Sequence, residues 1–120
     1  MEGSTRSKLD GADTRITQKE LLTNDLYIDP IGYQVKMGKT EIDLTVKEFD
    51  LLYLFAQNRG KVVKRAEVLK VISTPGMMDE DGAINVMICR LRKKLEDIPH
   101  RPRRLVSGRG LGYRLREQIS

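Results

Sequence analysis

The sequence predicts an α+β fold, in which a small N-terminal antiparallel sheet is followed by three helices and a C-terminal β-hairpin. Three observations predict this order. Short alternating apolar segments lie between residues 20 and 44, helical spacing of apolar residues occurs three times between residues 45 and 98, and a glycine-rich turn separates two apolar segments near the end. A chain of 120 residues, 39% of them hydrophobic, has the size of one domain with a modest core.

The first 17 residues are polar and show no periodicity, which is typical of a disordered tail or an interdomain linker. The folded domain is then expected over residues 18–120. The chain has no stretch near the ~18 unbroken apolar residues of a membrane span, and its N-terminus lacks the apolar centre of a signal peptide. We therefore expect a cytoplasmic protein.

Between Glu20 and Leu44, short apolar segments broken by turn residues predict a sheet of three or four strands. The pair Gly38-Lys39 suits a tight hairpin turn between two of them. The alternation places two sets of side chains on facing inner surfaces: Tyr33, Val35 and Met37 on one strand, and Ile42 and Leu44 on the next.

A first helix is predicted to follow Thr45 and to end at Gly60. Thr45 and Glu48 have the spacing of a capping box, in which each side chain bonds the backbone amide of the other residue. Gly60 can adopt the left-handed conformation that commonly terminates a helix. Apolar residues at helical spacing form its buried stripe: Phe49, Leu52, Phe55 and Ala56.

A shorter second helix is expected over residues 65–72, with Val68, Leu69 and Ile72 directed inward. Pro75 and Gly76 then impose a loop. The acidic residues 79–81 suit the start of a third helix, because a helix N-terminus carries a partial positive charge. The ligand spacing of a calcium loop is absent from this segment.

The third helix has two contrasting faces on a helical wheel. The inner face carries an apolar core stripe: Ile84, Met87, Ile88, Leu91 and Leu95. The opposite face carries small or neutral side chains bordered by cations: Gly82, Asn85, Val86, Cys89 and Lys93, flanked by Arg90 and Arg92. Such a face can approach a flat partner closely, while its arginines reach phosphates or the acceptor edge of guanine. The alternative is that Val86 and Cys89 pack beneath a neighbouring loop.

Positive charge is concentrated in the last third of the chain. Residues 82–120 contain ten Lys or Arg against three acids, a net charge of +7, whereas the first 81 residues carry 12 against 14, or −2. A local basic patch is expected of a protein that binds a polyanion, because each phosphate contact releases counterions. A solvated basic face without a partner is the alternative.

Other chemistry has little support in the sequence. Cys89 is the single cysteine, so it cannot form an internal disulfide, and it lacks companions at zinc-site spacing. His100 is the single histidine and lies in a polar loop with no evident nucleophile to serve. We therefore expect a reduced thiol, a surface histidine, no enzyme activity, no metal and no cofactor.

The segment VSGRGLGYRL, residues 106–115, contains three glycines around Arg109. A phosphate-binding glycine loop must lead into a helix, yet only a few residues follow this one. The flanking RRLVS and YRL are typical of two strands, with glycines taking positive φ in the turn and Arg109 at its tip.

A sheet, three helices and a cationic hairpin make a winged helix-turn-helix. Three segments closely resemble the DNA-binding effector domain of OmpR/PhoB-type response regulators: LTVKEFDLLYLFAQNRGKVVKR, INVMICRLRKKLED and LVSGRGLGYRL. The resemblance extends from about Glu20 to Leu115. It implies sequence-specific binding of double-stranded DNA in a two-component-type transcriptional regulator, with the third helix in the major groove and the wing in the adjacent minor groove.

The residues predicted to contact DNA come partly from the helical wheel and partly from this resemblance: Arg65, Asn85, Val86, Cys89, Arg90, Arg92, Lys93, Ser107 and Arg109. The resemblance places Arg65 near the DNA backbone, at the start of the second helix, and Ser107 on the wing. A narrow minor groove concentrates negative potential, which favours an arginine such as Arg109 at the tip.

The resemblance also implies partners: tandem direct repeats in DNA, RNA polymerase at the loop over residues 73–79, and an N-terminal receiver domain. The linker-like residues 1–17 favour a fragment of such a regulator. The chain departs from the usual pattern at Ser73, where the family has Trp, and over residues 82–87, where it has Arg-Thr-Val-Asp-Val-His. Lys64 replaces a small N-cap residue and adds a charge.

Two rival functions remain open because two usual DNA contacts are missing. The first is a winged-helix module that binds another protein through the same basic face. The second is RNA binding, which the lack of a run of exposed aromatic residues for base stacking disfavours.

Overall fold

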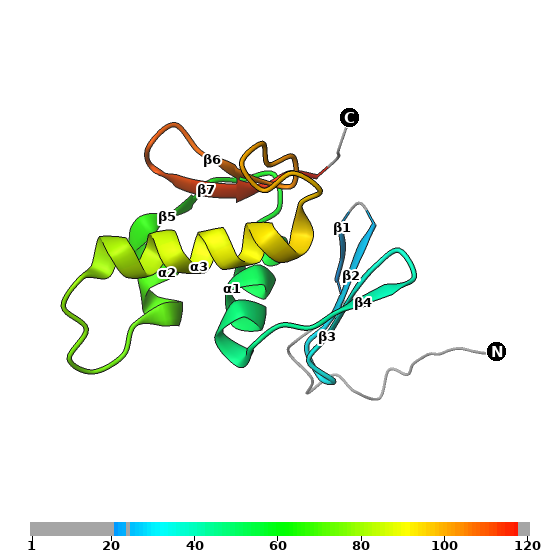
Figure 1. Ribbon diagram of the computed structural model, residues 1–120, viewed down its shortest axis with the longest axis horizontal. Helices are drawn as coiled ribbons and strands as arrows, with labels where there is room; N and C mark the ends of the chain where they lie inside the picture. Colours follow the sequence, from blue (N-terminus) through cyan, green and yellow to red (C-terminus); the bar gives the residue numbers. More distant parts are fainter. Residues whose placement is uncertain (1–20, 24, 118–120) are drawn as a thin grey trace.

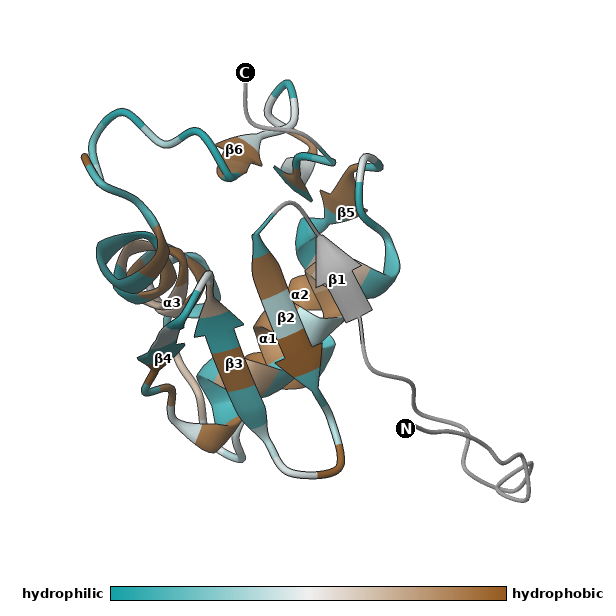
Figure 2. Cartoon of the chain, turned by 90° about the vertical axis from the view of Figure 1, so that its right-hand side faces the viewer, coloured by the Kyte–Doolittle hydropathy of each residue, from teal (hydrophilic) through white to brown (hydrophobic). Residues whose placement is uncertain are grey.

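The computed structural model describes residues 21–23 and 25–117; the predicted tail, residues 1–17, lies outside them. The predicted N-terminal sheet is confirmed. Its four antiparallel strands lie in the order β1 (Leu21–Thr23), β2 (Leu26–Asp29), β3 (Gln34–Met37) and β4 (Thr40–Ile42). Hydrophobic and polar residues alternate along β2 and β3, as Figure 2 shows.

The predicted hairpin at Gly38-Lys39 is also confirmed. Met37 pairs with Thr40 across the two-residue turn, and Gly38 has φ +64°. Val35 is buried and Met37 is half-buried. Tyr33 precedes β3, takes φ 52° and stays 49% exposed, while its ring stacks on Phe49 with centroids 4.5 Å apart. The inner face of β3 is therefore shorter than the alternation predicted.

Three helices occupy the middle of the chain: α1 (Val46–Gln57), α2 (Arg65–Ile72) and α3 (Glu80–Leu95). Figure 1 shows the N-terminal sheet beside these helices and the C-terminal strands above α3. The capping box of α1 is present, since Thr45 Oγ1 accepts from the Glu48 N–H at 3.2 Å and Glu48 Oε1 accepts from the Thr45 N–H at 3.0 Å. None of the helices in this described part of the chain is long and apolar enough to cross a membrane.

The end of α1 differs slightly from the prediction. Asn58 is its C-cap, and Gly60 lies in the following turn with φ +83°. The Gly60 N–H donates to the Leu115 carbonyl at 2.8 Å. Gly60 therefore directs the chain toward the C-terminal sheet after the helix has already ended.

The predicted core stripes are confirmed on all three helices. The four stripe residues of α1 are all buried, as are Val68 and Ile72 of α2, whereas Leu69 is half-buried. On α3 the stripe is buried except for Met87, which is half-buried. This shared core holds α3 with its opposite face turned outward.

One departure from the family pattern lies at the N-terminus of α3. Asp79 is the N-cap, and its Oδ1 accepts from the Gly82 N–H at 2.9 Å. A Cβ at Gly82 would collide with that carboxylate. A larger residue at position 82 would therefore require the Asp79 side chain to turn aside.

The C-terminal sheet contains β5 (Val63–Lys64), β6 (Leu105–Ser107) and β7 (Gly112–Leu115), in the order β5-β7-β6. The predicted hairpin is confirmed as β6 and β7. The strand β5 was not predicted, because two residues between two helices carry no alternation signal. Through β5 the wing is hydrogen-bonded to the segment that leads into α2.

The roles expected of the wing glycines were partly wrong. Gly110 takes φ +76°, but the other left-handed position belongs to Arg109 itself, with φ 57°. Gly112 lies within β7, where a Cβ would collide with the Val63 carbonyl. That glycine therefore permits the close approach of β5 rather than a turn.

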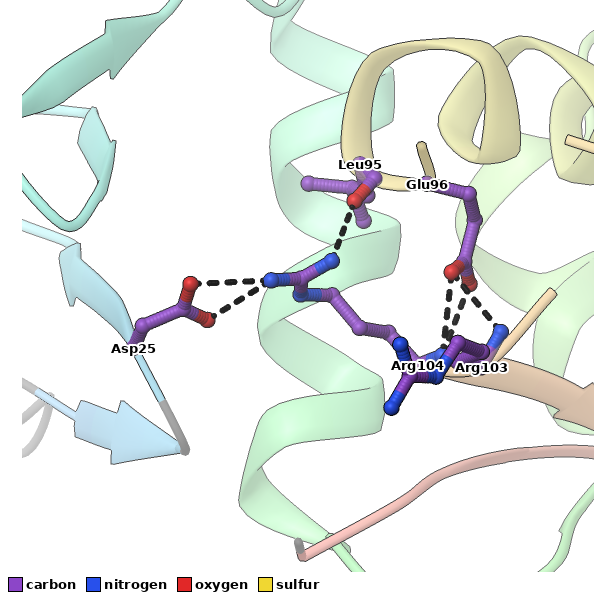
Figure 3. A network of polar contacts seen from close by, with 5 residues as sticks. All are labelled: Asp25, Leu95, Glu96, Arg103 and Arg104. Carbon is purple, nitrogen blue, oxygen red and sulfur yellow. Dashed lines mark hydrogen bonds and ion pairs between the residues drawn. The ribbon is translucent and has the colours of Figure 1, made fainter. Parts of the chain in front are cut away.

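A polar network, shown in Figure 3, fastens the end of α3 to the first residue of β6 and to the N-terminal sheet. The Glu96 carboxylate accepts the backbone N–H groups of Arg103, Arg104 and Leu105 at 2.8–3.1 Å. The Arg104 guanidinium donates to the Leu95 carbonyl at 2.8 Å and to both Asp25 oxygens at 2.8 and 3.0 Å. Arg104 is 8% exposed, so this cation serves the fold and not the surface charge.

The buried Glu48 forms a second ion pair, with the half-buried Lys94 of α3 at 2.6 Å. Burial raises the pKa of this carboxyl, but the bonds from Lys94 Nζ and the Thr45 N–H outweigh it, so the pKa is lowered overall. The ionised form therefore stabilises the fold above the unfolded-state pKa, and that contribution disappears as the pH falls through the folded-state pKa.

We expect Glu48→Gln to reduce the free energy of unfolding at pH 7 by about 1–3 kcal/mol, because a hydrogen-bonded charge is lost. The difference from wild type should shrink as the pH falls below about 5. Urea unfolding of both proteins at pH 7, 5 and 3.5 measures this difference in the free energy of unfolding. A difference that stays constant over this range would contradict the assigned ionisation.

Candidate nucleic-acid interface

The outer face of α3 is a row of exposed side chains. Five residues on this face are exposed: Asn85, Val86, Cys89, Arg90 and Lys93. The exposed fraction of Val86 is 47%. Packing of Val86 and Cys89 beneath a loop, the alternative considered from the sequence, is therefore wrong. We call these five residues the α3 ridge.

A hollow lies on each side of the α3 ridge. One, of about 460 Å³, lies between α3 and the wing, with Asn85, Cys89 and Lys93 on one wall and Tyr113 on another. The other, of about 350 Å³, lies toward the loop that follows α2, and Val86 and Arg90 line it. The ridge therefore stands out from its surroundings, as a helix must if it is to enter a groove.

Arg92 was predicted to border this face, but the structure shows it bound to the wing. Its Nε donates to the Leu105 carbonyl at 3.0 Å, and its guanidinium lies 5.8 Å from the centroid of the Tyr113 ring. An arginine at this distance from an aromatic face is attracted by the ring. Arg92 therefore ties α3 to β6 and β7, an internal role that the helical wheel does not show.

Arg65 is held in a similar way at the other end of α3. Its guanidinium donates to Asp81 Oδ1 at 3.0 Å and to the Tyr113 hydroxyl at 3.2 Å. These two bonds, with Asp81 the stronger influence, raise the pKa of Arg65. Its side chain is 33% exposed. Arg65 and Tyr113 thus connect the start of α2, the first turn of α3 and the wing.

The wing projects Arg109 as predicted. The residue is exposed at the tip of the β6–β7 turn, which the Gly108 N–H closes by donating to the Gly112 carbonyl at 2.8 Å. Ser107 is exposed at the end of β6 and pairs with Tyr113. A short hydrogen-bonded turn presents the arginine away from the body of the domain.

Several of the cations that give residues 82–120 their net charge of +7 have partners within the domain. Arg104 and Lys94 are paired inward, and Arg92 is bound to the wing. The exposed cations of this region lie on the α3 ridge, in the loop after α3 and at the wing tip: Arg90, Lys93, Arg101, Arg103 and Arg109.

Tyr113 and Asp81 were not predicted as site residues. Tyr113 alternates with Leu115 along β7, which marks it as inward-facing, but its hydroxyl partner on α2 has no signal in the sequence. His100 is exposed and lines the hollow beside the wing. Among the described residues, no group of three or more His, Cys, Asp or Glu is arranged to hold a metal ion.

Comparison with known proteins relates this arrangement to a family. A family model described as "Transcriptional regulatory protein, C terminal" matches residues 39–115. The transcriptional regulatory protein KdpE of Mycobacterium tuberculosis is 36% identical over 103 residues, which cover 86% of this chain and 46% of KdpE. The chain thus spans about half the length of this curated relative.

Solved structures agree with the match. The RstA DNA-binding domain of Klebsiella pneumoniae, crystallised with the RstA box, is 33% identical with a TM-score of 0.71 over 84% of this chain and all of that one. The Thermotoga maritima OmpR/PhoB homologue DrrB is 27% identical, with a TM-score of 0.75 over 93% of this chain and 57% of that one. The chain belongs to the C-terminal domains of transcriptional regulatory proteins, of the OmpR/PhoB winged helix-turn-helix type.

Proposed function

We propose that this domain binds double-stranded DNA sequence-specifically as the effector domain of a two-component-type transcriptional regulator. The observation that carries the proposal is the exposed α3 ridge beside the wing. Three ridge residues and Tyr113 of the wing line one hollow, and the wing exposes Arg109 at its tip. At 1.5 Å per residue the 16 residues of α3 extend about 24 Å, enough to cross a major groove about 12 Å wide.

In this arrangement the α3 ridge enters the major groove and Arg109 reaches the adjacent minor groove. Arg90 and Lys93 are the cations of the ridge and can contact phosphates, and Ser107 lies beside the wing turn. Arg65 and Arg92 contribute by holding the wing against α3, because Arg65 donates to Asp81 and Tyr113 and Arg92 donates to Leu105. The related RstA domain was crystallised with its RstA box, which supports the proposal.

We expect binding to duplex DNA to weaken linearly with the logarithm of salt concentration, by a slope near −0.9 for each phosphate contacted. In vitro selection from a random duplex pool, followed by fluorescence anisotropy from 50 to 300 mM salt, measures both specificity and slope. Enrichment of one motif together with a slope of several units is the expected result. No enrichment and no binding at low salt would reject the function.

The proposal extends to partners of the whole protein. We propose residues 18–120 as the effector domain and a receiver domain before it, and the match to KdpE, which covers 46% of that protein, supports this. We also propose a cytoplasmic site of action. We propose tandem direct repeats as the DNA target, to be tested by the spacing of selected motifs.

We also propose that the loop over residues 73–79 contacts RNA polymerase. The 95% exposure of Met78 in this loop supports the contact, and cross-linking from the loop tests it.

A further inference from the structure

We propose that Asn85 and Val86, two neighbouring residues of the α3 ridge, select A·T base pairs: Asn85 recognises adenine and Val86 contacts the methyl group of thymine. This inference rests on the proposed DNA binding, because it assumes that α3 lies in the major groove. It names the bases that these two side chains contact in the target site.

Asn85 has the chemistry that adenine requires. The residue is exposed, and its amide pairs with no other residue in the part of the chain that the structure describes. A side-chain amide offers a donor and an acceptor together. Adenine presents an acceptor at N7 beside a donor at N6, whereas guanine presents two acceptors and cytosine a single donor. Adenine is therefore the base that satisfies both groups of Asn85.

Val86 adds a preference for a neighbouring thymine. It is 47% exposed on the outer face of a helix, where it has only apolar atoms to offer. The thymine methyl is the apolar group of the major-groove edge, whereas the guanine carbonyl and the cytosine amino group would lose water against valine without gaining a hydrogen bond. Contact with Val86 therefore disfavours a G·C pair at that step.

The positions of the arginines agree with this assignment. Arg92 is bound to Leu105 and Tyr113, and Arg104 is buried against Asp25, which leaves Arg90 at the border as the exposed arginine of the ridge. Arginine bidentate to guanine is the commonest specific contact in the major groove. G·C recognition is therefore expected at Arg90 and A·T recognition at Asn85 and Val86.

Asn85 and Cys89 are four residues apart, so they lie on the same side of α3, about 6 Å from each other along the helix axis. Cys89 is exposed in the same row and offers a small side chain that allows close approach to the bases.

In vitro selection with the wild-type domain and with Asn85→Asp tests the adenine contact. Wild type should enrich an A·T step within its motif. A carboxylate accepts from cytosine N4, so Asn85→Asp should exchange adenine for cytosine at one position and bind the wild-type motif about 5- to 150-fold more weakly. Gln34→Glu, the same amide-to-acid change at an exposed site on β3, should leave motif and affinity unchanged.

Replacing thymine with deoxyuridine at the selected step tests Val86, because it removes the methyl group alone. Wild type should bind the uridine duplex about threefold to fivefold more weakly, since about one methyl group loses its apolar contact. Val86→Ser should bind the two duplexes equally.

The possible results separate the inference from the function beneath it. A wild-type motif without an A·T step, or an Asn85→Asp motif identical to wild type, would overturn the inference while leaving DNA binding intact. An equal loss on uridine substitution in wild type and Val86→Ser would overturn the valine contact. A wild-type domain that enriches no motif and binds no duplex would overturn the proposed function itself.

Discussion

Replacement of Glu96 by alanine is expected to lower the free energy of unfolding by about 3–5 kcal/mol. The carboxylate accepts the N–H groups of Arg103, Arg104 and Leu105, and it is 7% exposed. Alanine would leave these donors without their charged acceptor, at roughly 1–3 kcal/mol for each buried group. The loss is a large part of the ~5–15 kcal/mol that stabilises a typical domain.

Urea unfolding followed by circular dichroism measures this loss. Asp97→Ala is the matched control, because it removes an adjacent carboxylate that is exposed, and a change within about 0.5 kcal/mol is expected. Glu96→Gln keeps one acceptor oxygen and should fall between the two. If Glu96→Ala were no more destabilising than Asp97→Ala, the network in Figure 3 would not hold the start of β6.

Replacement of Arg109 is expected to weaken binding to the selected duplex by ~1–3 kcal/mol, if the side chain makes an ordered contact in the minor groove. This loss of affinity can be assigned to the side chain only if the substitution leaves the backbone of the β6–β7 turn unchanged. Arg109 has φ 57°, a conformation that asparagine adopts more readily than other non-glycine residues. Arg109→Asn therefore removes the charge with less strain than alanine would introduce.

Fluorescence anisotropy at several salt concentrations measures the change, and the salt slope should become shallower as a phosphate-rich groove loses a cation. Lys36→Ala is the matched control, since Lys36 is an exposed cation on β3 of the N-terminal sheet. Thermal unfolding should be nearly unchanged in both variants. Equal affinity of Arg109→Asn and wild type at low salt would refute the minor-groove contact.

Much of the fold was predictable because its signals act over a few residues. The capping box at Thr45 and Glu48 marked the start of α1, Pro75 and Gly76 marked the loop after α2, and the acidic residues near Asp79 marked the start of α3. The outer face of α3 was also predictable, because helical geometry separates Asn85 and Val86 from the core stripe. These features depend on backbone conformation and on the spacing of neighbouring side chains.

The direction of the long cationic side chains was not predictable in the same way. Arg104 pairs with Asp25, 79 residues away, and Arg65 donates to Tyr113, 48 residues away. A count of charges treats such residues as equivalent to Arg109, yet Arg104 is buried and Arg65 is hydrogen-bonded to partners within the domain. The conformation of each long side chain depends on the partner that the fold places near it. The residues adjacent in sequence do not indicate which partner this is.

The same distinction applies to the candidate interface. Local pattern was enough to locate the α3 ridge and the wing with Arg109 at its tip. Their relative position depends on β5, a two-residue strand paired with β7, and on the contacts of Tyr113 with Arg65 and Arg92. A two-residue strand is too short to show a periodic pattern, and side-chain contacts between residues far apart in sequence leave no local pattern. Both arise only once the core has packed the helices together.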